Sequence, residues 1–325
     1  MPIDSYGRTL NYARIALTDK CNLRCSYCMP ENGLNWLKNQ QLFSTQEIFF
    51  LLSILKSVGV TKIRFTGGEP TLRSDFKEIV EHAFEIGFEK IALTTNGTYS
   101  QELGSWLLNL PWSNINFSID ALKEDLFAAI SKRNNFNQVK TNLQQALKSN
   151  IPIKLNCVLM DGINDESLHD LVHFVKQNNV EVRFIEEMPF NGSEYRHAEK
   201  WSALRIQNEL KTILPDLTPL PFLPNSTSQL YSSQLLKGKI GVIAAYTRSF
   251  CGTCNRIRIT PEGFMKTCLY APPSLNIKQV IREKRSVNEI AKMIEAICLA
   301  KPADGFAAES MHSTENFQSM ATVGG

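Results

Sequence analysis

The sequence lacks the features that mark a secreted or membrane-embedded chain. Its first ten residues, MPIDSYGRTL, contain no basic start, no apolar core and no small-residue cleavage site. The longest apolar run, Ile48 to Leu52, is far too short to span a bilayer. We therefore expect a cytoplasmic protein without membrane contact, in a compartment where disulfides do not persist.

The sequence also has little excess charge of either sign. The formal net charge of the 325 residues is only +3, so the overall field gives no reason to expect a nucleic-acid partner. We find no internal repeat and no low-complexity tract. The length exceeds that of a usual single domain, although α/β barrels reach this size as one unit. One large domain with an appendage is expected.

Cysteine is scarce, and six of the eight cysteines fall into two clusters that each lack a fourth member. The clusters are C-x3-C-x2-C at Cys21, Cys25 and Cys28, and C-x2-C-x13-C at Cys251, Cys254 and Cys268. Three protein thiolates leave one iron of a four-iron cube open to a ligand that is not protein. We interpret the six cysteines as ligands of two iron-sulfur clusters whose open irons serve two different tasks.

Structural zinc is the main competing hypothesis for the second cluster. Zinc usually has four protein ligands, and Cys298 or His312 could complete a tetrahedron there, whereas the first cluster has no nearby fourth ligand. The two remaining cysteines, Cys157 and Cys298, lie among aliphatic residues. Free cysteine in such surroundings behaves as a small hydrophobe, so we predict that both belong to the core.

Short β-rich runs alternate with helical patterns along the first two thirds of the chain, which is typical of βα units and a parallel sheet. The predicted strands are Tyr12 to Thr18, Lys62 to Thr66, Lys90 to Thr95, Asn114 to Ile119, Ile153 to Leu159 and Val180 to Glu186. The predicted helices include Thr45 to Val58, Asp165 to Gln177 and Trp201 to Ile213, the first opened by a capping box at Ser44 and Glu47. The pattern predicts an incomplete (βα)6 TIM-like barrel.

The amino-acid composition changes after Pro215, where the segment TPLPFLPNSTSQ is rich in proline and polar turn formers. We place a domain boundary here. Residues 1–214 are predicted to form the partial barrel, and residues 215–325 a C-terminal iron-sulfur module that covers the barrel's lateral opening. This module is expected to contain short strands and a helix near Val287 to Leu299.

Distinctive segments follow the predicted strands one after another. They are the first cysteine cluster, Thr66-Gly67-Gly68-Glu69-Pro70, Thr94-Thr95-Asn96-Gly97 and Ser118-Ile119-Asp120. In parallel α/β barrels the chemistry sits where strands end, so these segments are predicted to share one rim. The glycine pair permits close approach of the backbone to a ligand, and Glu69 adds a negative charge there.

Strand alternation predicts which side chains face the barrel interior. The inward set contains four basic residues, Arg14, Arg64, Lys154 and Arg183, together with Asn116, Ser118 and Asn156. Buried cations are costly unless an anion pairs with them, and guanidinium groups suit phosphates. We predict a polyanionic ligand, with Arg256 and Arg258 directing further charge toward the second cysteine cluster.

These motifs resemble known families. CNLRCSYC with the following GGEP is similar to the signature of radical S-adenosylmethionine (SAM) enzymes. Within that superfamily, LTDKCNLRCSYCMP, KIRFTGGEPTLR, RFIEEMP, FCGTCNRIRIT and the terminal Gly324-Gly325 resemble the GTP 3',8-cyclase family of molybdenum cofactor biosynthesis. The resemblance extends from about Arg14 to the last residue.

The resemblance implies a reaction and its cofactors. Two 4Fe-4S clusters and SAM would be required, and reductive cleavage of SAM would give a 5'-deoxyadenosyl radical. That radical would take hydrogen from ribose C3' of GTP, whose guanine lies at the second cluster. The C3' radical would then attack C8 to form (8S)-3',8-cyclo-7,8-dihydroguanosine 5'-triphosphate. By matching motifs, the SAM contacts would be Tyr27, Gly68, Ser118 and Met188.

The resemblance also implies substrate contacts. Those to GTP would be Arg64, Thr95, Lys154, Arg183, Arg256 and Arg258, with Arg14 acting near the ribose or phosphates. The terminal Gly324-Gly325 would enter the active site, because glycine lets a chain thread a narrow pocket. Arg14, Gly324 and Gly325 are the predicted catalytic residues.

Other functions stay open at this point. A peptide-modifying radical SAM enzyme would also carry an auxiliary cluster, but typically with more cysteines, and a non-catalytic iron-sulfur protein would leave the strand-end motifs without a role. The sequence specifies neither the reductant nor the oligomeric state. An external electron donor is expected. A homodimer and docking with cyclic pyranopterin monophosphate synthase, the next enzyme in this family's pathway, are left open.

Overall fold

The computed structural model describes residues 1–30, 33–188, 200–311 and 319–324, and the chain divides into two compact units. The first unit contains Met1–Asn22, Gly33–Thr94 and Cys251–Gly325, and the second contains Leu23–Asn32 and Thr95–Phe250. The first unit is therefore built from both ends of the chain, and the second from its middle.

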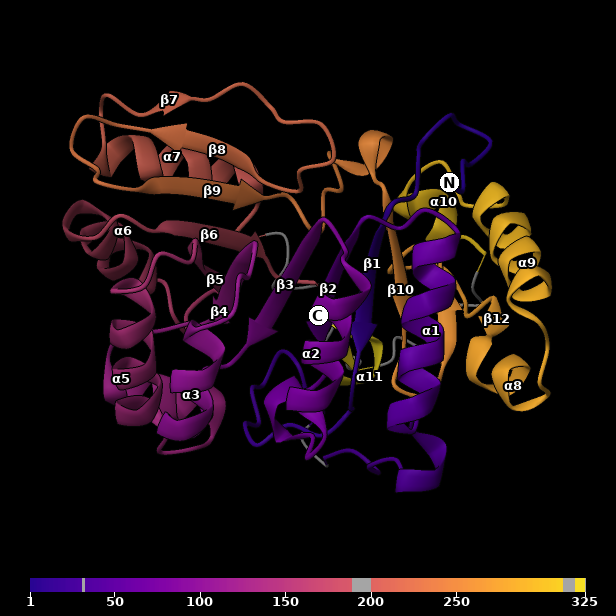
Figure 1. The fold of residues 1–325 in the computed structure, drawn as a ribbon. Helices are drawn as coiled ribbons and strands as arrows, with labels where there is room; N and C mark the ends of the chain where they lie inside the picture. Colours follow the sequence, from indigo (N-terminus) through magenta and orange to yellow (C-terminus); the bar gives the residue numbers. More distant parts are fainter. Residues whose placement is uncertain (31–32, 189–199, 312–318, 325) are drawn as a thin grey trace. The chain divides into compact units, whose positions relative to one another are not determined.

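The sheet of the first unit runs in the order β12-β11-β10-β1-β2-β3 (Figure 1). Its strands are β1 (Tyr12–Ala16), β2 (Lys62–Thr66), β3 (Lys90–Thr95), β10 (Arg256–Ile259), β11 (Phe264–Lys266) and β12 (Leu275–Asn276). Strands β10, β1, β2 and β3 are parallel, whereas β11 and β12 are antiparallel to their neighbours. A strand from the C-terminal part of the chain thus pairs directly with the first strand.

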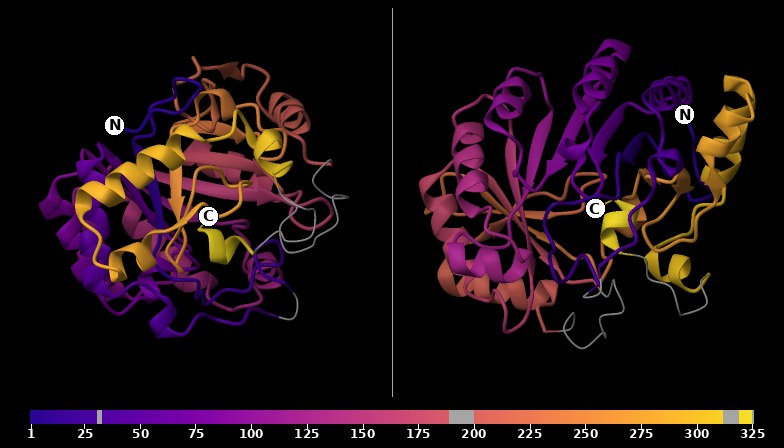
Figure 2. Two further views of the ribbon diagram at one scale, coloured as in Figure 1. Left: turned by 90° about the vertical axis from the view of Figure 1, so that its right-hand side faces the viewer. Right: turned by 90° about the horizontal axis from the view of Figure 1, so that it is seen from below.

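Helices of the first unit come from the same two ends of the chain. They are α1 (Thr45–Ser57), α2 (Phe76–Ile86), α8 (Ile277–Arg282), α9 (Val287–Leu299), α10 (Gly305–Glu309) and α11 (Met320–Val323). The predicted capping box opens α1: the Ser44 hydroxyl accepts from the Glu47 N–H, and the Glu47 carboxylate accepts from the Ser44 N–H. The C-terminal helices α8 and α9 lie against α1 (Figure 2).

The sheet of the second unit runs in the order β4-β5-β6-β9-β8-β7. Its strands are β4 (Asn114–Ser118), β5 (Ile153–Leu159), β6 (Glu181–Glu186), β7 (Thr218–Pro219), β8 (Gln229–Ser232) and β9 (Lys239–Ile243). Strands β4, β5, β6 and β9 are parallel, and β8 and β7 continue the sheet antiparallel. The helices of this unit are α3 (Gln101–Leu108), α4 (Glu124–Ser131), α5 (Phe136–Leu147), α6 (Ser167–Gln177) and α7 (Ala203–Ile213).

The two faces of strand β5 differ in burial: one face packs into the core, and the other carries half-buried side chains. Its burial alternates residue by residue, with Ile153, Leu155, Cys157 and Leu159 buried and Lys154 half-buried between them. The buried residues point to the face that the helices cover. The alternation predicted from sequence is therefore present, and Cys157 is a core residue as predicted.

The six predicted strands are all present, with ends that differ from the predicted ones by at most two residues. Helix α7 begins at Ala203 instead of Trp201 because the Ser202 hydroxyl accepts from the Arg205 N–H and caps it. The parallel roles of β9 and β10 were not predicted. The domain boundary between residues 214 and 215 stays a prediction, although β9, which follows it, pairs with β6, which precedes it.

Candidate active site

Side chains on three neighbouring strands of the first unit form what we call the cationic grid. The in-register rows are Arg256, Tyr12 and Lys62, followed by Arg258, Arg14 and Arg64. Alternate residues of a strand share a face, so all six side chains leave the sheet on one side. The residues between them, including Ala13, Ile63 and Ile257, are fully buried on the other side.

Burial and like charges act together on the pKa values of the grid. Burial and the charge of Arg258 hold the pKa of Arg14 well below its ordinary value. Burial and the charge of Arg256 lower the pKa of Arg258 to about 10. Because clustered, partly desolvated cations cost free energy, the grid favours a multiply charged anion as its ligand.

Tyr12 brings a phenol into this cluster of cations. Its hydroxyl oxygen accepts a hydrogen bond from Nε of Arg64 at 2.8 Å, and Nζ of Lys62 lies 4.3 Å from the centre of its ring. Burial alone would raise the pKa of Tyr12, but the charges of Arg64, Arg14 and Lys62 outweigh it and lower the pKa to about 7. The phenolate can therefore act as an internal counter-charge near neutral pH.

The C-terminal tail lies at the carboxyl ends of β1 and β2. Gly324 has a φ of +81°, and a Cβ there would lie 2.9 Å from Cβ of Ala16 and 3.3 Å from Cγ2 of Thr66. Arg258 donates a hydrogen bond to the Gly324 carbonyl. The tail and the grid are thus in contact at a position that accepts only glycine. Gly325 lies outside the described residues.

The second cysteine triad lies in the same unit. All three thiols are free and half-buried, and the Cys254 N–H donates to the Cys251 carbonyl at 3.0 Å. The pKa of Cys251 is raised, chiefly by burial and also by the negative charges of Cys268 and Cys254. Burial alone would raise the pKa of Cys254, but the charges of Arg256 and Lys301 lower it to about 6. Cys254 is therefore favoured in the thiolate form that binds metals.

Within the described residues, no three Cys, His, Asp or Glu side chains converge as the ligands of a single metal ion do. The cysteines of a four-iron cube each bind a different iron, so they surround a cluster and need not meet at a point. Three neighbouring thiols beside cations fit such a cube. Cys298 is fully buried, as predicted for a core residue, and burial raises its pKa to about 12. His312 lies outside the described residues.

The GGEP loop packs onto the segment that leads to Cys21. The Gly68 N–H donates to the Thr18 carbonyl at 2.7 Å, and the Glu69 N–H donates to the Lys20 carbonyl at 2.8 Å. A Cβ on Gly68 would lie 2.3 Å from the Lys20 carbonyl oxygen, a distance that no side chain can adopt. Glycine is therefore required here by the close approach of two backbones. The fully buried Glu69 carboxylate accepts from the Thr71 hydroxyl at 2.6 Å.

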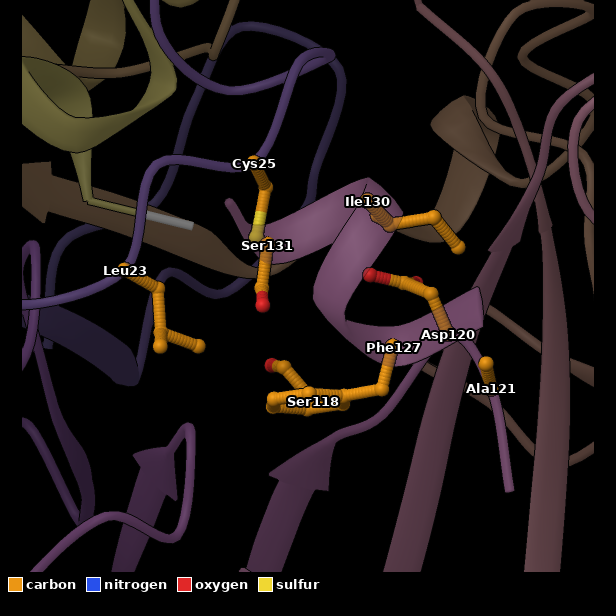
Figure 3. Close-up of a pocket in the computed structure, with 8 residues that line it drawn as sticks. All are labelled: Leu23, Cys25, Ser118, Asp120, Ala121, Phe127, Ile130 and Ser131. Carbon is orange, nitrogen blue, oxygen red and sulfur yellow. The ribbon is translucent and has the colours of Figure 1, made fainter. Parts of the chain in front are cut away.

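The second unit holds the other two cysteines of the first triad, Cys25 and Cys28. A hollow of about 230 Å³, counted with its open mouth, is lined by Leu23, Cys25, Ser118, Asp120, Ala121, Phe127, Ile130 and Ser131. Figure 3 shows the side chains of Cys25, Ser118 and Asp120 around this space; Ser118 is the last residue of β4, and Asp120 lies two residues beyond it.

Tyr27 is held beside this hollow by a carboxylate. Its hydroxyl donates to Oδ2 of Asp120 at 2.9 Å, and Oδ1 of Asp120 accepts from the Val158 N–H at 2.9 Å. Burial and the charge of Asp120 hold the pKa of Tyr27 well above its ordinary value. Burial raises the pKa of Asp120 to about 6 against the lowering effect of its hydrogen bonds. Tyr27 therefore remains a neutral donor with a fixed orientation.

The inward cations of the second unit share a carboxylate. Nζ of Lys154 lies 2.9 Å from Glu181, and Nε of Arg183 donates to the same carboxylate at 2.5 Å. Burial alone would raise the pKa of Glu181, but Arg183 and Lys154 outweigh it and lower the pKa. A polyanion that bound these two cations would thus compete with Glu181.

The remaining predicted residues have simpler surroundings. The Thr95 hydroxyl accepts from the Gly97 N–H at 3.0 Å, at the end of β3. Met188, two residues after β6, is half-buried. Cys21 is also half-buried and belongs to the first unit, whereas its two partners in the sequence motif belong to the second.

Sequence reasoning missed the roles of four residues that the structure brings to these clusters. Tyr12 and Lys62 have the same strand parity as Arg14 and Arg64, so the alternation could have identified them. Glu181 precedes Arg183 by two residues and shares its parity. Asp120 stood in a recognised strand-end motif, but only the fold shows that it binds Tyr27.

Two family models match the chain. The model described as "Radical SAM superfamily" matches residues 15–175, and "Molybdenum Cofactor Synthesis C" matches residues 180–306. The first match spans the first cysteine cluster and the GGEP loop, and the second includes Cys251, Cys254 and Arg256. The sequence motifs and the family models thus agree on the same segments.

Similar proteins match over nearly the whole chain. Molybdenum cofactor biosynthesis protein 1 of Dictyostelium discoideum is 38% identical over 92% of this chain, which spans only 48% of that protein. GTP 3',8-cyclase of Clostridium perfringens strain SM101 is 35% identical over 92% of this chain and 93% of its own length. The chain therefore spans about half of the Dictyostelium relative but almost all of the bacterial one.

A solved structure shares the fold. Streptococcus suis SuiB superimposes with a TM-score of 0.67 at 13% identity, covering 94% of this chain and 69% of that one. This likeness, with the parallel strands described above, confirms the predicted α/β partial barrel as the fold class. No helix in the described part of the chain has the length and apolar character needed to cross a bilayer.

Proposed function

Because the chain belongs to the radical SAM superfamily and, within it, to the GTP 3',8-cyclase family, we propose that it converts GTP to (8S)-3',8-cyclo-7,8-dihydroguanosine 5'-triphosphate. This is an early step of molybdenum cofactor biosynthesis. The observation that carries the proposal is the cationic grid, whose Arg256 follows Cys254 by two residues and lowers the pKa of its thiol. Cationic side chains suited to phosphates thus lie close to a cysteine triad suited to a metal cluster, both within the first unit.

Superfamily membership implies a 4Fe-4S cluster and SAM, which together supply the one-electron cleavage that gives a 5'-deoxyadenosyl radical. We assign Cys21, Cys25 and Cys28 to this cluster. The residues proposed to contact SAM are Tyr27, Ser118, Gly68 and Met188. Tyr27 suits a positioning task because Asp120 fixes its hydroxyl. Gly68 lies in the loop that packs onto the backbone leading to Cys21, which places it beside the first cysteine of this cluster.

We propose a second 4Fe-4S cluster at Cys251, Cys254 and Cys268, with the guanine base at its open iron. The grid residues Arg64, Arg256 and Arg258 would bind the triphosphate with Lys154, Arg183 and Thr95, and Arg14 would hold the ribose or phosphates. Guanidinium groups bind phosphate oxygens in forked pairs, so several arginines can fix the orientation of the nucleotide. A fixed orientation keeps ribose C3' and guanine C8 in the geometry that ring closure requires.

The reaction is tested with anaerobically reconstituted protein, SAM, a one-electron reductant and GTP that carries deuterium at C3'. We expect 5'-deoxyadenosine containing one deuterium and a cyclised triphosphate product. ATP in place of GTP is the control and should give only background cleavage. Unlabelled 5'-deoxyadenosine with GTP, or equal turnover with ATP, would contradict the assigned substrate.

The metal content separates iron from zinc at the second triad. Two cubes require about eight irons per chain, whereas one cube and a structural zinc require about four irons and one zinc. We expect the first result. Stoichiometric zinc that is lost in Cys254→Ala would overturn the second cluster while leaving the first in place.

The reaction requires an external one-electron donor, which we propose as a partner without specifying its identity. A homodimer and docking with cyclic pyranopterin monophosphate synthase remain predictions. Size-exclusion chromatography of the holoprotein, alone and with that synthase, tests both.

A further inference from the structure

Lys301 is a buried cation that immediately follows helix α9 and its C-terminal cap at Ala300. Only 3% of the residue is exposed. Its ammonium group donates to the carbonyls of Arg256 at 2.7 Å and Thr267 at 2.5 Å, and its Nζ lies 3.6 Å from Sγ of Cys254. An ammonium group has three N–H donors, and these three acceptors use all of them.

These acceptors belong to the two segments that carry the second cysteine triad. Arg256 follows Cys254 by two residues, and Thr267 immediately precedes Cys268. A buried charge is costly unless hydrogen bonds replace its hydration, so these contacts tie both segments to one point. Removing the charge would free both segments at the same time.

Arg8 fixes the chain segment that contains Lys301. Its guanidinium donates to the carbonyls of Pro302 at 2.5 Å and Ala303 at 2.6 Å, and also to the carbonyl of Cys251 at 3.0 Å. Asp4 balances its charge at 2.5 Å, with both side chains almost fully buried. The remaining cysteine segment is therefore held by the same buried network.

Lys301 contacts the sulfur of Cys254 itself, as Arg256 also does through its backbone N–H and its side chain. Hydrogen bonds to cluster sulfurs and nearby charge set the reduction potential of iron-sulfur clusters. A cation beside Cys254 stabilises the more negative, reduced form of a cluster bound there and so raises its potential. Arg8 contacts only backbone carbonyls near the triad, so its contribution is to hold the segments in place.

We propose that Lys301 is a positioning residue that orients Cys254 and raises the reduction potential of the second cluster. This inference rests on the second cluster of the proposed function. It assigns to α9 and the residues after it a direct part in the electronic properties of the site. Arg8 is assigned the separate task of retaining the cluster.

The test uses full-length protein in which Cys21, Cys25 and Cys28 are changed to alanine, so that only the second cluster contributes to the signal. Lys301→Met removes the charge but keeps most of the volume. We expect a midpoint potential more negative than that of the Lys301 parent, measured by titration followed with electron paramagnetic resonance. Arg8→Met should lower iron retention severalfold but leave the potential of the remaining cluster unchanged.

The outcomes separate the two proposals. A parent protein that binds no iron would refute the second cluster itself. An iron-loaded Lys301→Met protein with unchanged potential would refute the role of Lys301 alone. If Lys301→Met does not fold, by circular dichroism, Lys301→Gln retains a donor without the charge and should give a smaller negative shift; no shift there would also refute the role.

Discussion

At the scale of single residues, Tyr12 is the clearest case of a group whose chemistry is set by its neighbours. It lies between Arg256 and Lys62 in one row of the grid, with Arg14 and Arg64 in the next. Its pKa of about 7 is far below the ordinary value of 10.0.

We predict that Tyr12 ionises near neutral pH. Since its pKa is lowered in the folded state, the phenolate stabilises the fold at high pH, and this stabilisation is lost as the pH falls through about 7. The free energy of unfolding of the wild type, relative to Tyr12→Phe, should therefore rise between about pH 7 and pH 10. Tyrosinate absorbance and denaturant unfolding at each pH provide the two measurements.

A matched control is Tyr231→Phe, because burial raises the pKa of Tyr231 instead of lowering it. That variant should retain the ionisation near neutral pH. Persistence of the same ionisation in Tyr12→Phe, or its absence from the wild type, would contradict the prediction. Bound GTP should shift the ionisation upward, because the triphosphate neutralises the same cations.

At the scale of elements, strands β5 and β6 pair so that one carboxylate lies between two cations. Lys154 is directly opposite Glu181 in the register, and Arg183 is two residues further along β6. All three side chains are mostly buried, at 23%, 15% and 16% relative exposure. Glu181 thus holds the two cations in place while it also lowers their attraction for phosphate.

We predict that Glu181→Gln has opposite effects on binding and stability. The affinity for GTP should increase about fivefold, corresponding to about 1 kcal/mol, because the triphosphate no longer competes with a carboxylate. The free energy of unfolding without ligand should fall, because two partly buried cations lose their counter-ion. Calorimetric titration and denaturant unfolding measure the two effects.

Glu85→Gln is the matched control, since the Glu85 side chain is 77% exposed on α2. Both quantities should stay at their wild-type values there. Weaker GTP binding by Glu181→Gln would mean that the carboxylate serves mainly to orient Lys154 and Arg183.

The strands also show what sequence patterns can and cannot predict. Period-two alternation was sufficient to assign the inward faces of β1, β2, β5 and β6, because a parallel strand buried on one face leaves a strong signal. The grid was only partly predictable: Arg256 and Arg258 lie more than 190 residues from Arg64, and their register with β1 arises from long-range pairing. Buried contacts such as Tyr27 with Asp120 and Lys301 with Cys254 have no periodic signal at all.

At the scale of the whole molecule, the last residues of the chain return to its first strand. Gly324 lies against Ala16 at the end of β1, and Arg258 on β10 binds its carbonyl. We predict that deletion of Gly324 and Gly325 abolishes cyclisation but preserves iron content and GTP binding. Gly324→Ala should act in the same direction, because its Cβ would collide with Ala16.

The control for the tail is Thr322→Ser, which keeps the hydroxyl that donates to the Ser319 carbonyl. Turnover is measured as cyclised product per chain, and GTP binding by calorimetry. Unchanged turnover after the deletion would remove the tail from the mechanism. Loss of GTP binding would instead assign it to the substrate site.

The same topology determines whether the predicted domains can exist separately. Strand β10 pairs with β1 in the first unit, and β9 pairs with β6 in the second, so residues after 214 complete both sheets. A fragment of residues 1–214 would lose the buried side chains of Ile240, Val242, Ile257 and Ile259. At about 1.5–3 kcal/mol each, this loss is comparable to the total stability of a typical domain, about 5–15 kcal/mol.

We therefore predict that the fragment 1–214 does not fold cooperatively, because it also exposes an unpaired edge on β1 and another on β6. Thermal unfolding followed by circular dichroism should show no sharp transition, and the fragment should aggregate on size-exclusion chromatography. Co-expression with residues 215–325 should restore a soluble complex, since the missing strands can pair again. A soluble, cooperatively unfolding fragment would show that the partial barrel is an autonomous domain, for which β9 and β10 are dispensable additions.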